Sequence, residues 1–297
     1  MQWTDCGDHL EIHLPNEFSF SECLTFLGRS QLEVMHDIQE DTLYKLIKVD
    51  NDRILMKINC KDQKLIVKFL DKKTKQKEIV VGYITEWFDL ERDLSVFYEA
   101  ASEDPILHPL TQRYYGLRII GIPDLFEALT WAIMGQQINL KFAYTLKRRF
   151  VENFGEKLNC NGKLFWLHPT PEVIANLKTD DLRKLQFTER KAEYVIGVAK
   201  EMSSGQLSKK ALKESKNPAQ QLISIRGIGA WTADYCLMKC LLKPNAYPIA
   251  DVGLHNAVMK QLEQDRKPTI DELKKFAENW SGWEGYATFY LWRSLYE

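Results

Sequence analysis

The 297-residue chain lacks any run approaching ~18 consecutive apolar residues, the length a helix needs to cross a membrane, so we expect no membrane partner. Its amino terminus, Met1-Gln-Trp-Thr-Asp-Cys, also lacks the basic start and apolar core of a secretory signal, and we therefore expect a cytoplasmic protein. In that compartment the 6 cysteines are expected to be free thiols. Net charge is nearly absent as well, at -1.

That near-zero net charge hides an uneven distribution. Residues 1–116 hold 14 Lys and Arg against 21 Asp and Glu, a net charge of -7, whereas residues 117–297 hold 26 against 20, a net charge of +6. The overall sum would argue against a nucleic-acid partner. The asymmetry instead suggests that the basic half has an electrostatic task.

Hydrophobic periodicity divides the chain near the same place. Up to about residue 85 the alternation of apolar and polar residues predicts a small antiparallel sheet with one helix packed on it and a solvated lysine-rich turn at 72–75. The predicted strands are His9 to Leu14, Thr42 to Val49, Arg53 to Ile58 and Lys64 to Leu70, and the predicted helix spans Ser19 to Gly28.

From Thr85 onward the apolar residues recur with a helical period. We therefore predict an α+β fold: a mixed domain over residues 1–112, then an all-α core over residues 113–297 that forms either one domain or two helical subdomains. The predicted helices are 86–101, 124–136, 140–154, 171–177, 189–203, 218–224, 230–242, 252–263, 269–280 and 284–296.

The most informative motif is the pair of glycines in Gly227-Ile-Gly229, which separates two short helical patterns. Glycines permit a tight turn and the close approach of another backbone, and the next helix points free N–H groups toward its start, an arrangement that suits a phosphate. The alternative interpretation of this motif is an ordinary turn between two helices that binds no phosphate. The apolar and small residues that flank the glycines favour a helix-hairpin-helix element at residues 218–242, of the kind that grips a DNA backbone.

Asp251 is the second landmark, 22 residues after Gly229 and directly before a helical run. On its own it is a good N-cap, a role worth about 1 kcal/mol. One helix and a return loop fit between the two residues, so the carboxylate can also come back beside the second helix of the hairpin. The two roles are compatible, since a helix N-terminus favours a negative charge.

With these motifs in order, the chain resembles the helix-hairpin-helix DNA glycosylases, and among them the AlkA-type 3-methyladenine DNA glycosylases, over nearly its whole length. Each motif is weak alone, and the series is specific. The motifs are Gly121-Ile-Pro-Asp-Leu-Phe-Glu-Ala-Leu, Ala132-Ile-Met-Gly-Gln-Gln, His168-Pro-Thr-Pro, Arg190-Lys-Ala-Glu, Ile225-Arg-Gly-Ile-Gly-Ala-Trp-Thr-Ala-Asp-Tyr and Ala250-Asp-Val-Gly-Leu.

The resemblance implies hydrolysis of the N-glycosidic bond of alkylated bases in base excision repair. Such enzymes flip the damaged nucleotide out of double-stranded DNA and hold the base in a pocket. Asp251 matches the catalytic aspartate, whose negative charge stabilises the developing positive charge on the sugar. Trp231, Tyr235, Trp292 and, more weakly, Phe26 match the aromatic residues that stack on a cationic alkylated base, with core packing as the alternative for each.

The resemblance also implies how the chain holds DNA. A monovalent ion, Na⁺ or K⁺, would sit on the backbone carbonyls of Ile223, Ile225 and Gly227. Otherwise no cofactor is expected, and no iron-sulfur cluster, because no cysteine follows Cys240. The enzyme is expected to act as a monomer, associated with the nucleoid if it is bacterial. The candidate DNA contacts are Gly227, Gly229, Thr232, Gln137, Arg190 and Lys191, with Lys147 and Arg148 as further basic candidates.

Departures from the family pattern separate the possible mechanisms. Members that also cut the strand carry a nucleophilic lysine two residues after the second hairpin glycine, and here that position is Trp231, so we expect no lyase activity. Gln137 stands where a relative has an apolar wedge, so it either bonds the orphaned base, is replaced as wedge by another residue, or merely ends a helix. Val252 replaces a pocket aromatic, which leaves the range of lesions open.

Three other functions remain open at this level. An 8-oxoguanine-type glycosylase of the same superfamily also pairs a small amino-terminal domain with a helical core, although it would need the missing lysine. A non-catalytic helix-hairpin-helix DNA-binding protein would keep the hairpin without a use for Asp251. A helical protein-interaction module would bind no DNA at physiological salt.

Overall fold

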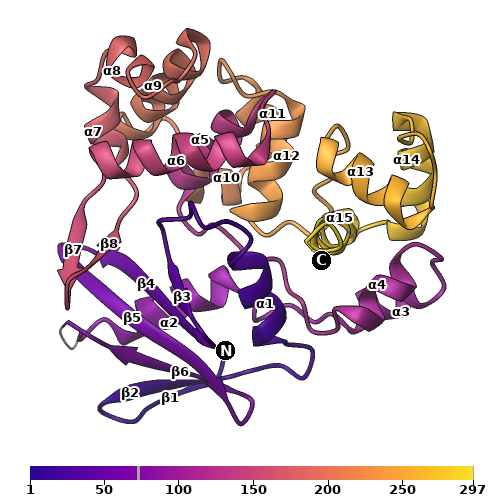
Figure 1. Ribbon diagram of the computed structural model, residues 1–297, viewed down its shortest axis with the longest axis horizontal. Coiled ribbons are helices and arrows are strands. Elements are labelled where there is room, and N and C mark those ends of the chain that lie inside the picture. Colours follow the sequence, from indigo (N-terminus) through magenta and orange to yellow (C-terminus); the bar gives the residue numbers. More distant parts are fainter. Residues whose placement is uncertain (72–73, 297) are drawn as a thin grey trace.

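The computed structural model describes residues 1–71 and 74–296, and the predicted lysine-rich turn at 72–75 therefore lies partly outside the described residues. A large antiparallel sheet forms one end of the molecule, and most of the rest is helical (Figure 1). The predicted α+β fold class is confirmed. All six cysteines are free, as expected. No helix in the described ranges has the length and apolar character that a bilayer crossing requires.

The sheet has six strands in the order β1-β2-β6-β5-β4-β3, and every neighbouring pair is antiparallel. Alternation of side chains puts Leu10, Ile12, Leu65 and Val67 on one buried face. The four strands predicted from the sequence are present, and β1 and β3 are short strands added at the two edges. The bounds are Trp3–Asp5 (β1), His9–His13 (β2), Asp37–Gln39 (β3), Thr42–Val49 (β4), Asp52–Lys61 (β5) and Lys64–Phe69 (β6).

Helix α1 (Phe20–Leu27) lies where the sequence predicts it. The Ser19 side chain caps its first turn by accepting a hydrogen bond from the Glu22 amide. Phe26, a candidate pocket residue, projects from this helix and is 3% exposed. The amino-terminal part therefore contributes a side chain to the region where the site is expected.

The predicted helix at 86–101 is wrong in its bounds. The chain forms α2 (Lys77–Trp87) and α3 (Ser95–Ser102), with an irregular turn between them. Asp89 has a φ of 47°, which ends the helix. The buried Arg118 donates from Nη1 to the carbonyls of Asp89 and Arg92, so a residue from a later part of the chain stabilises the turn that local periodicity did not predict.

The remaining helices largely follow the sequence prediction, and the spans 140–154 and 189–203 are reproduced residue for residue. Short helices α4, α8 and α10 were not predicted. The bounds are Leu107–Arg113 (α4), Leu125–Gly135 (α5), Leu140–Phe154 (α6), Pro171–Ala175 (α7), Thr179–Arg183 (α8), Glu189–Ser203 (α9), Lys209–Glu214 (α10), Pro218–Ile223 (α11), Ala230–Lys239 (α12), Val252–Gln261 (α13), Ile270–Ala277 (α14), Glu278–Trp280 (a 3₁₀ turn) and Glu284–Arg293 (α15).

The helical half is not purely helical, because a small hairpin of β7 (Lys157–Cys160) and β8 (Lys163–Trp166) interrupts it. Asn161 and Gly162 form its turn with φ angles of 51° and 82°. Asn-Gly between two short runs is a strong hairpin signal, so the sequence did contain the information. In Figure 1 this hairpin hangs from the helical part beside the large sheet, and β8 contacts β4.

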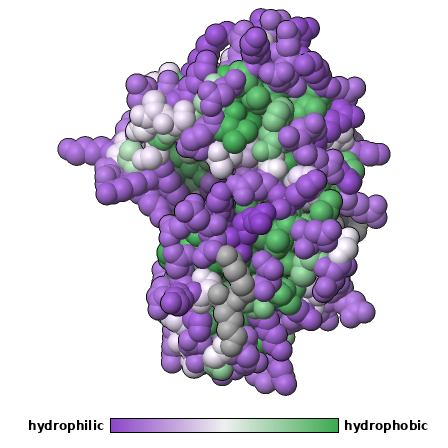
Figure 2. Space-filling view, turned by 90° about the vertical axis from the view of Figure 1, so that its left-hand side faces the viewer, coloured by the Kyte–Doolittle hydropathy of each residue, from purple (hydrophilic) through white to green (hydrophobic). Residues whose placement is uncertain are grey.

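A single hydrophobic core cluster includes buried residues from both halves, from Leu10 in the sheet to Trp292 near the carboxyl end. Residue 112 falls inside α4, and α4 packs against α15 at the far end of the chain (Figure 1). The sheet and the helices therefore share a continuous packed interior. On the side shown in Figure 2 the surface is mostly hydrophilic and carries separate hydrophobic patches.

A buried ion cluster joins the two parts. Lys147 on α6 lies 3.0 Å from a Glu33 carboxylate oxygen and 3.3 Å from one of Glu127, and the three side chains are 9 to 11% exposed. Burial alone would raise the pKa of Glu33, but the Lys147 ammonium and His36 outweigh it and hold that pKa well below its usual range. Lys147 therefore holds the loop before β3 against α5 and is not a surface phosphate contact.

Replacing Lys147 with methionine should lower the free energy of unfolding by about 3 kcal/mol, because it leaves two buried carboxylates without their cation. Urea denaturation at pH 7 measures this. As the pH falls below the usual pKa of glutamate, about 4.3, the difference from wild type should shrink, because the unfolded chains and the folded variant bind protons on these glutamates while the folded wild type, whose Glu33 pKa is lowered, does not. Equal midpoints for the two proteins at pH 7 would show that the cluster does not hold the halves together.

Candidate active site and DNA interface

The helix-hairpin-helix element is formed by α11 and α12, joined by the turn that contains Gly227 and Gly229. Gly227 has a φ of +95°, and a β-carbon there would overlap the ring of Tyr194 on α9. Only glycine adopts this φ without strain, and only glycine leaves room for the Tyr194 ring. Gly229 caps α12, and a β-carbon there would meet nothing within 4 Å, so this side of the turn is open.

Gln136 fastens the hairpin to α5. Its side-chain amide donates to the Gly227 carbonyl at 2.9 Å and to the Thr232 hydroxyl at 3.0 Å. Thr232 is 2% exposed and its side chain serves this internal contact, so a phosphate contact at the helix start near Thr232 would have to come from backbone amides. Sequence reasoning missed Gln136, although it stands next to Gln137 in the motif already singled out.

Asp251 is surrounded by hydrogen-bond donors from three directions. Its Oδ2 accepts from Trp231 Nε1 on α12 at 3.0 Å, and its Oδ1 accepts from Trp292 Nε1 on α15 at 2.8 Å. Oδ1 also accepts from the Leu254 amide at 2.8 Å, which makes Asp251 the N-cap of α13. The carboxylate is partly exposed and held in one orientation. A β-carbon on Gly253 would stand 2.9 Å from Oδ1, so glycine leaves room for it.

The candidate pocket aromatics form a row beside this carboxylate. The ring centroids of Trp231 and Tyr235 are 5.7 Å apart, and those of Tyr235 and Trp292 are 6.0 Å apart. Phe289, which sequence reasoning missed, continues the row at 6.4 Å from Trp292 and 4.4 Å from Phe26. Residues far apart in the sequence are thus brought together, with the two indole N–H groups on the carboxylate.

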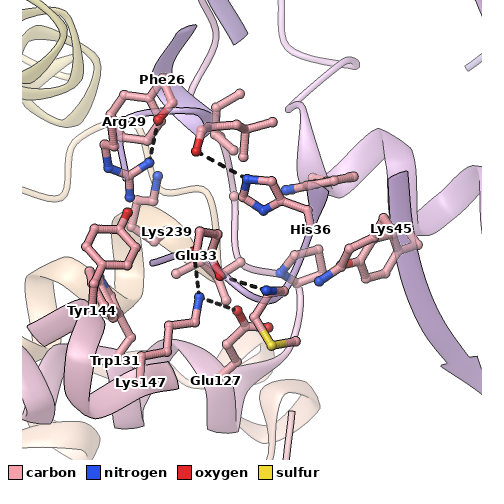
Figure 3. A pocket seen from close by; sticks show the side chains of 18 of the residues that line it. Phe26, Arg29, Glu33, His36, Lys45, Glu127, Trp131, Tyr144, Lys147 and Lys239 are labelled. Atoms are coloured by element: carbon pink, nitrogen blue, oxygen red, sulfur yellow. Dashed lines mark hydrogen bonds and ion pairs between the residues drawn. The ribbon is translucent and has the colours of Figure 1, made fainter. Parts of the chain in front are cut away.

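Tyr235 is also one of the residues that line a cavity, together with Phe26, Arg29 and Lys239 (Figure 3). Arg29 stacks its guanidinium 4.0 Å from the centre of the Phe26 ring, and Lys239 lies near the same ring at 5.0 Å. The cavity is also bordered by the ion cluster of Glu33, Glu127 and Lys147. Aromatic and cationic side chains therefore line this cavity together.

The remaining candidate DNA contacts divide into exposed and buried residues. Gln137 is exposed and has a φ of 56°. It directly follows Gln136, whose side chain bonds to the hairpin. Arg190 is exposed in the first turn of α9. Lys191 is 7% exposed and donates to the Met134 carbonyl at 2.7 Å, and burial lowers its pKa. Because its ammonium is directed inward, the expectation that Lys191 contacts a phosphate is corrected.

The three residues whose carbonyls are predicted to hold a monovalent ion, Ile223, Ile225 and Gly227, line one surface hollow. The Ile225 carbonyl accepts from the Ile228 amide at 3.0 Å, and the Gly227 carbonyl accepts from Gln136. A carbonyl oxygen has two lone pairs, so each keeps one for a cation. The donor set is compatible with Na⁺ or K⁺.

The match to known families divides the chain in two. Residues 130–282 match the model of the HhH-GPD superfamily of base excision DNA repair proteins, and residues 12–129 match that of the 8-oxoguanine DNA glycosylase N-terminal domain. The first match covers the hairpin and Asp251. The chain belongs to the HhH-GPD superfamily of base excision DNA repair proteins.

Among individual relatives, the chain is 45% identical over 303 residues to a DNA-3-methyladenine glycosylase of Bacillus subtilis (strain 168), and the similarity covers 100% of both chains. It is 28% identical over 178 residues to DNA-3-methyladenine glycosylase 2 of Escherichia coli (strain K12), which covers 60% of each chain. The family predicted from the motifs is confirmed.

Solved structures agree on the fold. The 3-methyladenine DNA-glycosylase of Archaeoglobus fulgidus superimposes with a TM-score of 0.83 at 25% identity and covers 95% of this chain and 96% of its own. The 8-oxoguanine glycosylase/lyase of Clostridium acetobutylicum, in complex with DNA, has a TM-score of 0.78 at 18% identity over 99% of this chain and 97% of its own. The latter similarity concerns the fold alone.

Proposed function

We infer that the protein is a DNA glycosylase that hydrolyses the N-glycosidic bond of alkylated bases in base excision repair. The observation that carries this is the Asp251 carboxylate, fixed by Trp231 and Trp292 beside the hairpin. Support for the alkylated substrate comes from the 45% identity, along the full length, to a relative named DNA-3-methyladenine glycosylase. We also propose that the enzyme acts as a monomer.

The chemistry follows from the position of the carboxylate. As the bond between C1′ and the base nitrogen breaks, positive charge develops on the sugar, and the negative Asp251 stabilises it. A water oxygen then bonds to C1′, and its proton leaves to the carboxylate or to solvent. A base alkylated on a ring nitrogen is already cationic and departs as a neutral molecule, so no acid is needed to protonate it.

The hairpin and its surroundings are proposed to hold the DNA backbone. The amides of Gly227 and Gly229, the exposed Arg190 and an ion on the hairpin carbonyls would contact phosphates, which gives affinity that weakens with salt. Gln137 is the residue we propose for the gap left by the flipped nucleotide, because it is exposed at a turn beside the hairpin. The residues of the hollow fit the ion, which would supply positive charge to a phosphate.

The second candidate function, 8-oxoguanine excision with strand cleavage, is favoured by the match of residues 12–129 to the 8-oxoguanine glycosylase N-terminal domain. That match lies outside the hairpin and Asp251. At the position of the nucleophilic lysine, Trp231 donates its Nε1 hydrogen to Asp251 and has no nucleophilic nitrogen. Hydrolysis without a Schiff base is the reaction that this residue supports.

The test is incubation of the protein with a duplex that carries one alkylated base, followed either by hot alkali or by no treatment. We expect strand breaks only after alkali, because the enzyme leaves an intact abasic site. Borohydride added during the reaction should trap no protein–DNA adduct. Strand breaks without alkali, together with a trapped adduct, would contradict the hydrolytic mechanism, and absence of breaks in both arms would contradict the glycosylase function.

A further inference from the structure

Three side chains that can bind a metal ion meet at the edge of the large sheet. Cys6, His9 and Glu11 each bring one donor atom to within 4.8 Å of those of the other two. They come from the turn between β1 and β2 and from β2 itself, at the end of the molecule opposite α11 and α12 (Figure 1). The cluster is therefore separate from the helix-hairpin-helix element.

The pairing of β1 with β2 explains why these residues meet. Cys6 donates its amide hydrogen to the His9 carbonyl at 3.0 Å, across a turn of two residues. Residues opposite each other in an antiparallel pair share a face of the sheet, and so do residues two apart in one strand. The intervening Leu10 is fully buried, so His9 and Glu11 lie on the opposite face. Cys6 lies on that face as well.

Asp8 orients the imidazole of His9. Its Oδ1 lies 2.7 Å from His9 Nδ1, and because an ionised carboxylate only accepts hydrogen bonds, the hydrogen of a neutral ring is placed on Nδ1. The lone pair of Nε2 is then free, and Nε2 lies 3.6 Å from Glu11 Oε1. A carboxylate that fixes the tautomer of a ligand histidine in this way is the usual outer partner in zinc sites.

Glu11 uses only one of its oxygens for an ion pair. Its Oε2 binds the Lys64 ammonium at 2.7 Å, which holds the carboxylate in place, whereas Oε1 faces the His9 ring. Oε1 and the free Nε2 are both acceptors, and 3.6 Å is too long for a hydrogen bond. A cation between the two atoms would satisfy both of them.

A thiolate, an imidazole and a carboxylate together suit a borderline transition metal. Ca²⁺ and Mg²⁺ prefer oxygen ligands alone, whereas Zn²⁺ binds sulfur, nitrogen and oxygen at about 2.0–2.3 Å in a tetrahedron. Two such donors are roughly 3.4–3.6 Å apart, close to the 3.6 Å between His9 and Glu11. The exposed Cys6 thiol would complete the set by a shift of at most about 1 Å.

We propose that Cys6, His9 and Glu11 bind Zn²⁺, with water as the fourth ligand. Asp8 is the outer partner that orients the histidine. On binding, the Cys6 thiol releases its proton to solvent and coordinates the metal as the thiolate. The ion links the turn to β2 and so stabilises the edge of the sheet. The proposal is independent of the glycosylase function, since the site lies at the far end of the sheet (Figure 1).

Cobalt substitution tests the site, because Co²⁺ can take the place of Zn²⁺ and reports its ligands by absorption. The reduced full-length protein is treated with EDTA, desalted and titrated with Co²⁺. We expect a thiolate-to-cobalt charge-transfer band and the visible bands of tetrahedral Co²⁺, complete at about one equivalent and lost when Zn²⁺ is added. Zn²⁺ should also raise the midpoint of thermal unfolding, because it binds the folded chain.

Four variants identify the ligands. Cys6→Ser should abolish the charge-transfer band and the shift in midpoint, and His9→Gln should weaken metal binding by at least about tenfold. Asp8→Asn should weaken binding by about tenfold but keep the band, because Asp8 is not itself a ligand. The matched control is Cys60→Ser, which removes another exposed thiol of the same sheet, from β5, and should leave the band and the midpoint shift unchanged.

Two results would overturn the proposal directly: absence of a thiolate band in wild type, or its persistence in Cys6→Ser. Saturation only at millimolar Co²⁺, with equal affinity in all variants, would show adventitious binding and overturn it as well. Release of 3-methyladenine from methylated DNA should be the same with and without Zn²⁺. Failure of the zinc site and failure of the glycosylase function are therefore measured separately.

Discussion

Replacing Asp251 with asparagine should slow base release from alkylated duplex DNA by on the order of 10³-fold, because the variant lacks the negative charge that stabilises the sugar cation. Asparagine has nearly the same shape and can still cap α13 by accepting from the Leu254 amide. The amide NH₂ cannot accept from Trp231 Nε1, so we expect a loss of about 1 kcal/mol in stability but a folded protein. Single-turnover kinetics on a duplex with one lesion measures the effect.

DNA affinity of the same variant should be retained, or even increase, since a negative charge close to the phosphates is removed. Fluorescence anisotropy with the lesion duplex measures this. The matched control is Asp265→Asn, which changes an exposed aspartate in the turn after α13 and should leave the rate within about threefold of wild type. An Asp251→Asn enzyme with a wild-type rate would remove the carboxylate from the mechanism.

Replacing Gly227 with alanine should disrupt the hairpin. The new β-carbon would overlap the Tyr194 ring, and the φ of +95° is one that alanine adopts only with strain. We expect a loss of about 2 kcal/mol in the free energy of unfolding and at least a tenfold weaker affinity for duplex DNA, since the turn must shift away from Tyr194 and Gln136. Urea denaturation and a DNA titration at constant salt measure the two effects.

Gly229→Ala is the matched control in the same turn. Its φ is -90°, and a β-carbon there would meet nothing within 4 Å, so the free energy of unfolding should stay within about 0.5 kcal/mol of wild type. If the two alanine variants are equally stable, the close packing of Gly227 against Tyr194 does not define the hairpin.

Hydrophobic periodicity was sufficient to predict the helices whose ends are set by neighbouring residues in the sequence. Helices α6 and α9 have a clear apolar face, and a side-chain cap opens each, so their bounds follow from the sequence. The turn between α2 and α3 could not be predicted in this way. It depends on Arg118, which reaches back to the Asp89 and Arg92 carbonyls from a later part of the chain.

The same distinction holds in the site. Motif order pointed to Asp251, Trp231 and Trp292, and the structure brings these three residues into hydrogen-bond contact. It does not support every basic candidate, because a lysine in a motif can be directed inward, as Lys191 is, or neutralised by buried glutamates, as Lys147 is. Burial of that kind depends on how helices pack, which residue type and spacing do not specify.

The cavity residues were the hardest to foresee. Arg29 follows α1 in the amino-terminal part, whereas Lys239 ends α12, and only the packing of the two halves brings both to the Phe26 ring.

The account is tested most directly by a mass-spectrometric survey of the bases that wild-type protein releases from methylated and from oxidised duplex DNA, with Asp251→Asn in parallel. We predict that methylated purines appear from the methylated DNA, that they are absent with the variant, and that oxidised DNA yields no release above background. Release of 8-oxoguanine in preference to methylated purines, or equal release by wild type and variant, would contradict it.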